Sequence, residues 1–312
     1  MTDVSVVIVS YESRGLLERC LAALAADSGH TVTREVIVVD QASSDGTAEW
    51  VAAEHPEVRL VALDENVGFG AGNNRGARVA EGRWLLLLNS DAFVRPGAID
   101  ELVRFAEARP RAGIVGPRLL WPDGRLQRSC RRFPTVFRIA TEFLYLRKIA
   151  PRSRILNGFY YGEFAHDEPW RVDWVTGACM LVRAELFEQL AGFDEDFFLY
   201  SEEVDLLYRA RRRGAETWYD PAAEVVHEWG GTAGRASALT LQEQSRSHVR
   251  YLDKHRSRTT AKRARIVLLT GLRLRARRSA AYREAARWLA ARSVPQLLAE
   301  TRPGTAQGAG SE

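Results

Sequence analysis

Amide and carboxylate side chains follow an apolar run in the amino-terminal half of the chain. Residues 84–88 are all apolar, and the run stops abruptly at Asn89, Ser90 and Asp91. Such an uninterrupted run is typical of a strand buried inside a parallel sheet. A carboxylate at its end could hold a hard divalent cation, and the cation could hold phosphate oxygens. The alternative is that Asp91 only caps a helix that starts near Pro96.

Two earlier apolar runs end in the same way. The first run is followed by Ser10, Tyr11 and Glu12, and the second is followed by Asp40. The carboxyl ends of parallel strands meet at one edge of a sheet, where open α/β sheets bind their ligands. Each of these residues alone is more often a turn former, but their shared position favours a binding site.

An acidic cluster farther along the chain is a candidate for acid–base chemistry. Glu202 and Glu203 follow a run rich in aromatic residues, which would desolvate a carboxylate and raise its pKa toward the working range of a general base. The alternative is that these acids only favour the dipole at a helix start. His227 ends a short apolar run and is a candidate metal ligand, although a lone histidine is more often structural.

Strands and helices alternate in the amino-terminal part. Apolar runs predict the strands, and apolar residues at helical spacing predict the helices between them. The expected strands are residues 4–9, 36–39, 58–62 and 84–88, and the expected helices are residues 16–24, 47–54 and 73–80. This order predicts an α/β fold with a mainly parallel sheet and helices on both faces.

Two common phosphate-binding motifs are missing from the sequence. No Gly-x-Gly-x-x-Gly follows the first expected strand, and no Gly-Lys-Ser/Thr loop occurs in the chain. Gly68, Gly70 and Gly72 come after the third strand instead. Glycine there allows a positive φ angle or a close backbone approach.

Taken together, these segments resemble the family 2 inverting glycosyltransferases with the GT-A fold, over about residues 4–235. The segments that carry the resemblance are Val38–Thr47, Asn66–Phe69, Asn89–Asp91, Gly192–Glu195 and Phe198–Leu206. Within the family, the chain is most similar to the rhamnosyltransferases that extend a polyprenyl-diphosphate-linked GlcNAc. That similarity rests on Trp121–Gly124, Trp174–Gly177, and His227 with Thr232–Arg235.

The resemblance implies a role for each candidate residue. The nucleotide sugar would be held by Ser10, Tyr11, Glu12, Asp40, Asn66, Gly68, Asn73, Asn89 and Ser90. Asp91 stands at the last position of the family's DXD-type motif and would bind Mg²⁺ or Mn²⁺, with His227 as a further ligand. Glu203 would be the general base, Glu202 is the alternative base, and Asp205 would orient the helix or the acceptor.

Two positions depart from the family pattern. Asn89 replaces the first carboxylate of the metal-binding motif, so the metal site has one fewer negative charge. The family's base is usually the Asp of a Glu-Asp pair, whereas this chain has Glu202-Glu203. The base would therefore sit on a side chain that is one methylene longer.

The chain has 312 residues and a net charge of +4, and much of the positive charge lies toward its end. Residues 254–292 contain thirteen Lys or Arg residues and one acidic residue, Glu284, so the remainder is net acidic. Apolar residues alternate with these arginines, as in basic amphipathic helices that lie on anionic membranes. A solvated helix face and nucleic-acid binding are the alternatives. No nucleic-acid module is recognisable, so we expect no nucleic-acid partner.

Cysteine usage and the amino terminus indicate the compartment. Cys20, Cys130 and Cys179 lie far apart, so neither a disulfide framework nor a zinc site is expected. No secretory signal is recognisable, and no apolar run approaches the roughly 18 residues that span a bilayer. We therefore expect a cytoplasmic protein that is peripheral at the inner face of the cell membrane.

The sequence thus gives one main hypothesis of organisation and function. Residues 1–235 would form the GT-A domain with an acceptor-side insertion at about 125–171, residues 236–300 a helical basic membrane-associating segment, and residues 301–312 a disordered tail. The expected reaction moves L-rhamnose from dTDP-L-rhamnose to a lipid-linked glycan in cell-wall or surface polysaccharide synthesis. The alternatives are a UDP- or GDP-linked donor, or a catalytically inactive scaffold that binds nucleotide or lipid. No pattern points to an oligomeric state.

Overall fold

The computed structural model of the chain describes residues 2–27, 31–228, 237–277 and 279–300. The tail at 301–312 and the segment Thr232–Arg235 lie outside the described residues. The chain divides into two compact units. The first unit comprises Met1–Phe133, Phe164–Asp194 and Glu203–Gly234, and the second comprises Pro134–Glu163, Glu195–Glu202 and Arg235–Glu312.

The first unit contains the sheets and six helices within the described residues. Its strands are β1 (Val4–Ser10), β2 (Arg34–Gln41), β3 (Arg59–Leu63), β4 (Trp84–Asn89), β5 (Ala92–Val94), β6 (Ala112–Leu120), β7 (Leu126–Gln127), β8 (Cys130–Arg131), β9 (Trp170–Val172), β10 (Trp174–Val175), β11 (Cys179–Arg183) and β12 (Glu216–His227). Its helices are α1 (Arg14–Ala26), α2 (Thr47–Glu54), α3 (Phe69–Ala77), α4 (Ala98–Glu107), α6 (Ala184–Gln189) and α7 (Glu202–Arg212), the last of which begins at the border with the second unit.

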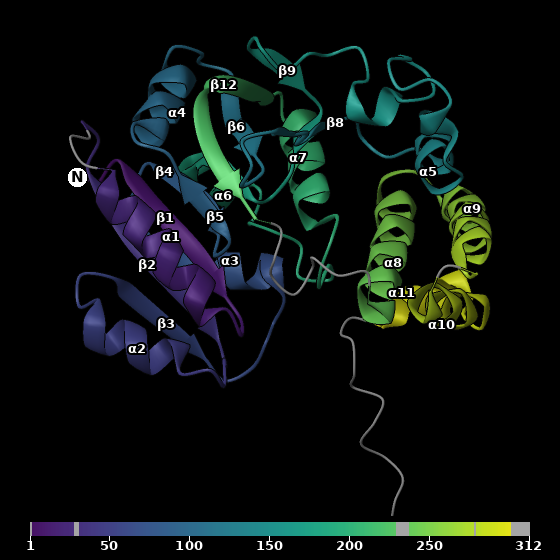
Figure 1. Ribbon diagram of the computed structural model, residues 1–312, viewed down its shortest axis with the longest axis horizontal. Helices are drawn as coiled ribbons and strands as arrows, with labels where there is room; N and C mark the ends of the chain where they lie inside the picture. Colours follow the sequence, from purple (N-terminus) through teal and green to yellow (C-terminus); the bar gives the residue numbers. More distant parts are fainter. Residues whose placement is uncertain (1, 28–30, 229–236, 278, 301–312) are drawn as a thin grey trace, which may run out of the picture. The chain divides into compact units, whose positions relative to one another are not determined.

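The main sheet has the strand order β3-β2-β1-β4-β11-β6-β12-β5 (Figure 1). The first four strands along the chain are parallel to one another, and β6 is parallel to β12. Between these two groups β11 runs antiparallel to both β4 and β6. The parallel half arises because each of its strands is connected to the next by a helix, which returns the chain to the same end of the sheet.

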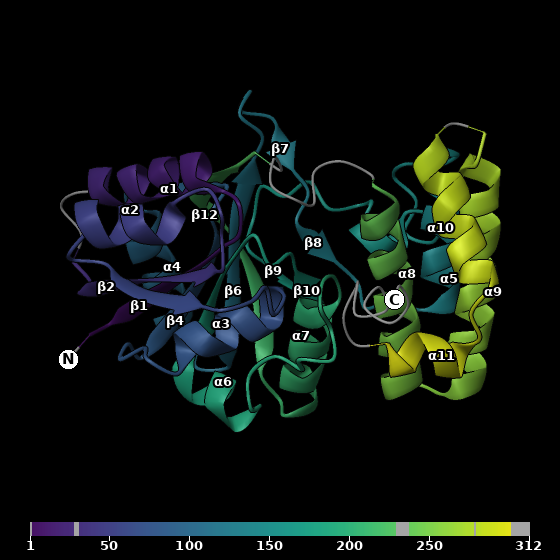
Figure 2. The same cartoon turned by 90° about the horizontal axis from the view of Figure 1, so that it is seen from below.

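Helices cover both faces of this sheet, as the sequence predicted. Figure 2 shows α1 and α2 on one side of the parallel strands and α3 and α6 on the other. Alternate side chains of β1 point to opposite faces of the sheet. On one face, Val6 and Ile8 belong to the core cluster that includes Leu17 of α1. On the opposite face, α3 lies so close that a Cβ on Gly76 would be 2.4 Å from Val7 Cγ1. The glycines of the loop-helix segment thus allow close packing of a helix on a strand.

The second unit is helical in its described residues. Its elements are α5 (Val136–Phe143), η1 (Leu146–Lys148), η2 (Gly158–Tyr160), α8 (Ala238–His255), α9 (Arg258–Arg275), α10 (Ala280–Ala290) and α11 (Val294–Ala299). Helix α5 packs against α9, where a Cβ on Gly271 would be 2.8 Å from Phe143 Cβ. Leu252, Leu272 and Leu289 are fully buried between the helices. This unit therefore has an apolar core of its own.

Candidate active site

Three of the predicted residues end neighbouring strands at the carboxyl edge of the sheet. Ser10 of β1 pairs in register with Asp40 of β2, and Val9 pairs with Asn89 of β4. Since neighbouring strands are about 4.8 Å apart, Asp40 and Asn89 lie about 10 Å from each other on either side of β1. The parallel pairing therefore brings these residues to the same edge of the sheet.

Serine hydroxyls connect the turn after β1 with the turn after β4. Ser10 Oγ lies 2.9 Å from Ser13 Oγ, and Ser13 Oγ lies 3.1 Å from Ser90 Oγ. Ser10 and Ser13 are buried. This chain of hydroxyls holds the two strand ends together.

Glu12 connects the turn after β1 with the turn after β2. Its side chain is exposed, and its Oε1 accepts hydrogen bonds from the Ser44 N–H at 2.8 Å and the Ser44 hydroxyl at 2.9 Å. Tyr11 beside it is half-buried. Asp40 accepts a hydrogen bond from the Ser43 N–H at 3.1 Å through Oδ2, which leaves Oδ1 for another partner.

The glycine-rich segment forms a turn and then α3, four residues earlier than predicted. Asn66 Oδ1 accepts a hydrogen bond from the Gly68 N–H at 3.0 Å, and Gly68 adopts a φ of 90° that favours glycine. Asn73 donates through Nδ2 to the Phe69 carbonyl at 3.0 Å. Asn66 and Gly68 thus shape the turn, and Asn73 lies in the first turns of the helix that follows.

Four buried oxygens of the predicted residues have no hydrogen-bond partner among the described residues. They are Asp40 Oδ1, Asn73 Oδ1, Asn89 Oδ1 and Glu203 Oε2. A buried acceptor without a partner costs about 1–3 kcal/mol, and such groups are uncommon in folded proteins. Other buried atoms of this kind occur elsewhere in the described residues, so what favours a ligand here is that these four belong to the predicted site residues.

Asp91 and His227 lie side by side. The antiparallel pairing of β5 with β12 sets His227 opposite Ala92, and the Glu228 N–H donates to the Asp91 carbonyl at 3.0 Å. His227 Nε2 is 3.3 Å from Asp91 Oδ1, and each side chain is 9% exposed. The alternative in which Asp91 caps a helix is wrong, because β5 intervenes and α4 begins after Gly97.

Gln127 is a neighbour of His227 that the sequence reasoning missed. Its Oε1 lies 2.6 Å from His227 Nδ1. The sequence feature that could have indicated this contact is the segment Trp121–Gly124. It forms the turn between β6 and β7 and so returns the chain to the neighbourhood of β12. No group of three or more His, Cys, Asp or Glu side chains suited to a metal ion occurs within the described residues.

Glu203 lies in the first turn of α7, near the end of β4. Its Cβ is 3.8 Å from the position of a Cβ on Gly177, and the carbonyl of the next residue, Ala178, accepts a hydrogen bond from the Asn89 N–H at 2.9 Å. Burial raises the pKa of the Glu203 carboxyl, while backbone N–H groups and the positive charge of Arg131 oppose that rise. A carboxylate with a raised pKa is suited to accept a proton.

The other two predicted acids have different surroundings. Asp205 is fully buried, and its Oδ2 accepts a hydrogen bond from Arg209 Nε at 2.7 Å. Arg209 also donates to the carbonyls of Leu190 and Gly192 at 2.6 and 2.8 Å. Asp205 therefore holds the Arg209 side chain, which ties α7 to the end of α6. Glu202 is 4% exposed and is the last residue of its stretch of the second unit.

Asn74 is a further residue that the sequence did not single out. It is buried, its Nδ2 donates to the Phe193 carbonyl at 3.0 Å, and its Oδ1 accepts from the Phe193 N–H at 2.8 Å. This pair of bonds holds the Gly192–Glu195 segment against α3. Sequence pattern alone gives no sign of such a contact, because the partners are 119 positions apart.

Comparisons with known proteins agree with this architecture. The family profile described as "Glycosyl transferase family 2" matches residues 5–191. The chain is 35% identical over 268 residues to N-acetylglucosaminyl-diphospho-decaprenol L-rhamnosyltransferase of Mycobacterium tuberculosis, which covers 82% of this chain and 86% of that protein. It is 25% identical over 234 residues to rhamnosyltransferase WbbL of Escherichia coli, which covers 72% of this chain and 83% of that protein.

Solved structures resemble the fold at low sequence identity. A mannosyltransferase from Pyrobaculum calidifontis, in complex with GDP-Man and Mn²⁺, matches with a TM-score of 0.55 and 19% identity over 93% of this chain and 81% of that one. GalNAc-T7 with UDP, GalNAc and Mn²⁺ matches with a TM-score of 0.56 and 17% identity over 79% of this chain and 47% of that one. At these identities the likeness concerns the fold alone.

Proposed function

Because this chain belongs to glycosyltransferase family 2 and is therefore a sugar-transferring enzyme, we propose that it moves L-rhamnose from dTDP-L-rhamnose to a lipid-linked GlcNAc. The proposal for sugar and acceptor is supported by the 35% identical relative, whose name specifies both L-rhamnosyl transfer and N-acetylglucosaminyl-diphospho-decaprenol. The match extends over most of both proteins.

The observation that carries the proposal is the set of buried oxygens without partners at the carboxyl edge of the sheet. Asp40, Asn73 and Asn89 each present one such oxygen. An oxygen acceptor fits a ring N–H or a hydroxyl group, and a nucleotide sugar carries both kinds of donor. The donor would thus supply the hydrogen bonds that these residues lack.

Asp91 and His227 are suited to hold a divalent cation. A carboxylate oxygen and a neutral imidazole nitrogen are both ligands of Mn²⁺, and phosphate oxygens of the donor would complete the coordination. When bound, Mg²⁺ or Mn²⁺ neutralises charge that develops on the departing diphosphate. Bound Mn²⁺ in two proteins of similar fold also supports this use of a metal.

Glu203 would act as the general base. Its Oε2 would accept the proton of the acceptor hydroxyl as that oxygen attacks the anomeric carbon, and the bond to the nucleoside diphosphate breaks at the same time. The attack comes from the face opposite the leaving group, so the anomeric configuration inverts. Glu203 Oε2 is buried and so has little access to bulk water.

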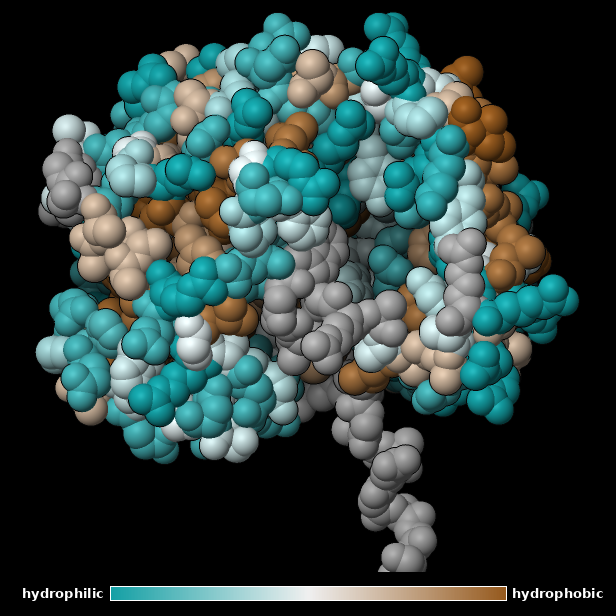
Figure 3. Space-filling model, viewed as in Figure 1, coloured by the Kyte–Doolittle hydropathy of each residue, from teal (hydrophilic) through white to brown (hydrophobic). Residues whose placement is uncertain are grey.

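Exposed hydrophobic side chains of the second unit support contact with a membrane that holds a lipid-linked acceptor. None of the helices in the part of the chain that the structure describes is long and apolar enough to cross a membrane. The exposed large hydrophobic side chains are Phe137, Ile149, Ile155, Leu239, Ile266 and Leu274, and all six belong to the second unit. Figure 3 shows hydrophobic residues, coloured brown, along the edge of α5 and α9. This surface would contact the membrane peripherally, on its cytoplasmic side.

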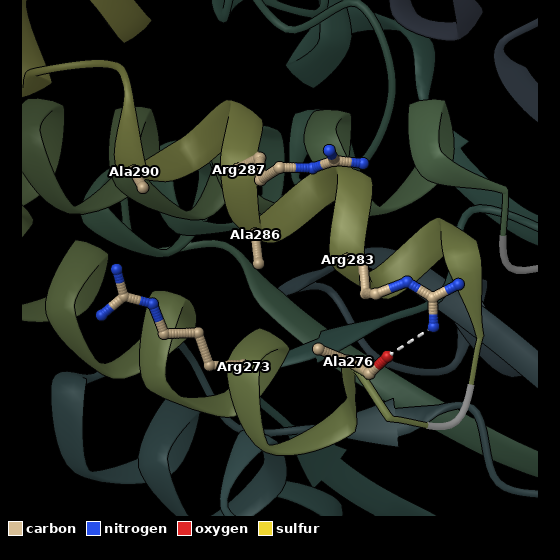
Figure 4. Close-up of a pocket in the computed structure, with 6 residues that line it drawn as sticks. All are labelled: Arg273, Ala276, Arg283, Ala286, Arg287 and Ala290. Carbon is tan, nitrogen blue, oxygen red and sulfur yellow. Dashed lines mark hydrogen bonds between the residues drawn. The ribbon is translucent and has the colours of Figure 1, made fainter.

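Arginines of α9 and α10 add positive charge to the second unit. Arg273 of α9 with Arg283 and Arg287 of α10 border a groove of about 400 Å³, whose other lining residues are alanines. In Figure 4, Arg273 and Arg287 extend in opposite directions, and Arg283 donates to the Ala276 carbonyl. Guanidinium groups that point apart suit several anionic lipid headgroups better than a single chelated anion. Each basic residue near the lipid surface contributes about 1 kcal/mol of binding free energy.

A donor panel tests the proposal. Purified enzyme with GlcNAc-diphosphoryl-polyprenol and Mn²⁺ should transfer sugar from dTDP-L-rhamnose far faster than from UDP- or GDP-linked sugars. Preference for a UDP- or GDP-linked sugar would overturn the donor assignment. Nucleotide binding without transfer from any donor would favour a catalytically inactive scaffold. Asn89 and Glu203 depart from the family pattern, and this is the argument from the sequence for such a scaffold.

A further inference from the structure

Gln127 is a buried residue that the tight turn after β6 brings to His227. The Trp121 N–H donates to the Arg125 carbonyl at 2.8 Å, and Gly124 closes the turn with a φ of 79°. The strand that follows pairs Gln127 with Leu119. Because Leu119 also pairs with Val225 of β12, the turn delivers Gln127 to the end of β12, where it is 4% exposed.

The two ends of the Gln127 amide contact the same histidine. Its Nε2 donates to the His227 backbone carbonyl at 3.3 Å, which directs Oε1 toward His227 Nδ1 at 2.6 Å. An amide oxygen can only accept a hydrogen bond, so Nδ1 must carry the hydrogen. In a neutral imidazole the lone pair is then on Nε2.

That lone pair faces a carboxylate. Nε2 is 3.3 Å from Asp91 Oδ1, so in the neutral imidazole the lone pair lies next to the carboxylate. A divalent cation would be held by both of these atoms. Metal-binding histidines generally donate their other ring N–H to an oxygen that fixes the tautomer.

We propose that Gln127 is a positioning residue that fixes the Nδ1–H tautomer of His227 and thereby presents Nε2, together with Asp91, to the divalent cation. The inference rests on the metal site of the proposed function and adds a residue to it. Without Gln127, the hydrogen could move to Nε2 and bond to Asp91. The two ligands would then satisfy each other and bind the metal weakly.

Three variants test this role in the full chain. Gln127→Met removes the acceptor at nearly constant size, and Gln127→Glu keeps an oxygen acceptor opposite Nδ1. Gln41→Met is the matched control, since Gln41 is also 4% exposed and its Oε1 accepts a hydrogen bond from the Val67 N–H.

Two measurements are made on each protein. Mn²⁺ affinity is measured from the electron paramagnetic resonance signal of the free ion, in the absence of nucleotide sugar and of the glycan acceptor. Nitrogen NMR of ¹⁵N-histidine-labelled, metal-free protein reports the tautomer, with His227→Gln to assign the signals.

The proposal predicts a clear pattern of results. Gln127→Met should weaken Mn²⁺ binding by about 10-fold or more and move the His227 hydrogen to Nε2. Gln127→Glu and Gln41→Met should bind Mn²⁺ nearly as the wild type does. The proposal is overturned if the wild type carries its hydrogen on Nε2, if it binds no Mn²⁺, or if Gln127→Met binds Mn²⁺ normally. A wild type that binds Mn²⁺ in the expected tautomer but transfers no rhamnose would contradict the proposed function alone.

Discussion

Glu203 is a carboxylate that its surroundings make costly to ionise. Burial raises its pKa above the ordinary 4.5 of glutamate. Between the ordinary pKa and the raised pKa, the folded state therefore binds more protons than the unfolded state. The free energy of unfolding therefore falls as the pH rises from the ordinary value through the raised pKa. A destabilising group of this kind is typical of a functional site, where residues needed for activity often lower the stability of the fold.

The first prediction is that Glu203→Gln is more stable than the wild type at neutral pH. The amide avoids the cost of ionisation, and the gain should disappear as the pH falls below 4.5, where both forms are neutral. Urea unfolding at several pH values measures the difference. The exposed Glu188→Gln on α6 is the control and should stay within about 0.5 kcal/mol of the wild type. A loss of stability in Glu203→Gln at neutral pH would count against this account.

The second prediction concerns Asn89, which stands where the family pattern has a carboxylate. Its Oδ1 is buried without a partner among the described residues. Asn89→Asp adds a negative charge that is costly without a counterion, so the metal-free protein should unfold at a lower temperature. Mn²⁺ should bind more tightly than to the wild type and restore that temperature. Equal shifts by Mn²⁺ in both proteins would show that Asn89 is remote from the metal.

At the scale of elements, α3 reaches the site because glycines let it lie close to β1. A Cβ on Gly76 would be 2.4 Å from Val7 Cγ1, which no real side chain allows. The helix contains Asn73, which we propose contacts the donor, and it holds Phe193 through Asn74. Close packing at Gly76 therefore bears directly on the geometry of the site.

The third prediction is that Gly76→Ala destabilises the protein by about 1–3 kcal/mol through overpacking. Val7→Ala removes the atom that clashes, so the double variant should lose at least about 1 kcal/mol less than the sum of the single variants. Gly15→Ala in α1 is the control, because nothing lies within 4 Å of its added Cβ, and it should be neutral or slightly stabilising. Strict additivity at Gly76 and Val7 would refute the close contact.

Much of the architecture could be predicted from the sequence because its signals are local. The GT-A fold of the family is confirmed, as are the alternation of strands and helices and the exact extent of α2 at Thr47–Glu54. Because β1, β2 and β4 are parallel neighbours, Ser10, Asp40 and Asn89 lie at the same edge of the sheet, and this shared position followed from pattern and topology.

Contacts between distant segments could not be predicted in this way. Gln127 meets His227 only because a hairpin and a ladder bring together residues 100 positions apart. Asp205 resembles a catalytic acid in the sequence, and only the structure gives its bond to Arg209. The start of α3 at Phe69 was missed because its glycines lower helix propensity, while packing on β1 favours the helix.

At the scale of the whole molecule, the fourth prediction concerns the membrane. Ile266 and Leu274 of α9 are 60% and 61% exposed, and burying each in lipid would contribute about 1.5–3 kcal/mol. Ile266→Glu with Leu274→Glu should weaken binding to anionic phospholipid vesicles by on the order of tenfold or more. Turnover of a water-soluble, short-chain acceptor should not change.

The control adds the same kind of charge to the other unit. Ala52→Glu lies on an exposed position of α2 and should leave vesicle binding nearly unchanged. Co-sedimentation with vesicles measures binding for all three proteins. If the α9 variant binds as the wild type does, the second unit does not use this surface on the membrane.

The central claim is that Glu203 removes the acceptor proton during sugar transfer at the end of β4. The most direct test is the single-turnover rate of transfer from dTDP-L-rhamnose to GlcNAc-diphosphoryl-polyprenol in Glu203→Gln, with Glu202→Gln beside it. The account predicts a loss of about 10²- to 10⁴-fold for Glu203→Gln, with donor binding intact, and a much smaller loss for Glu202→Gln. Wild-type transfer by Glu203→Gln would contradict it.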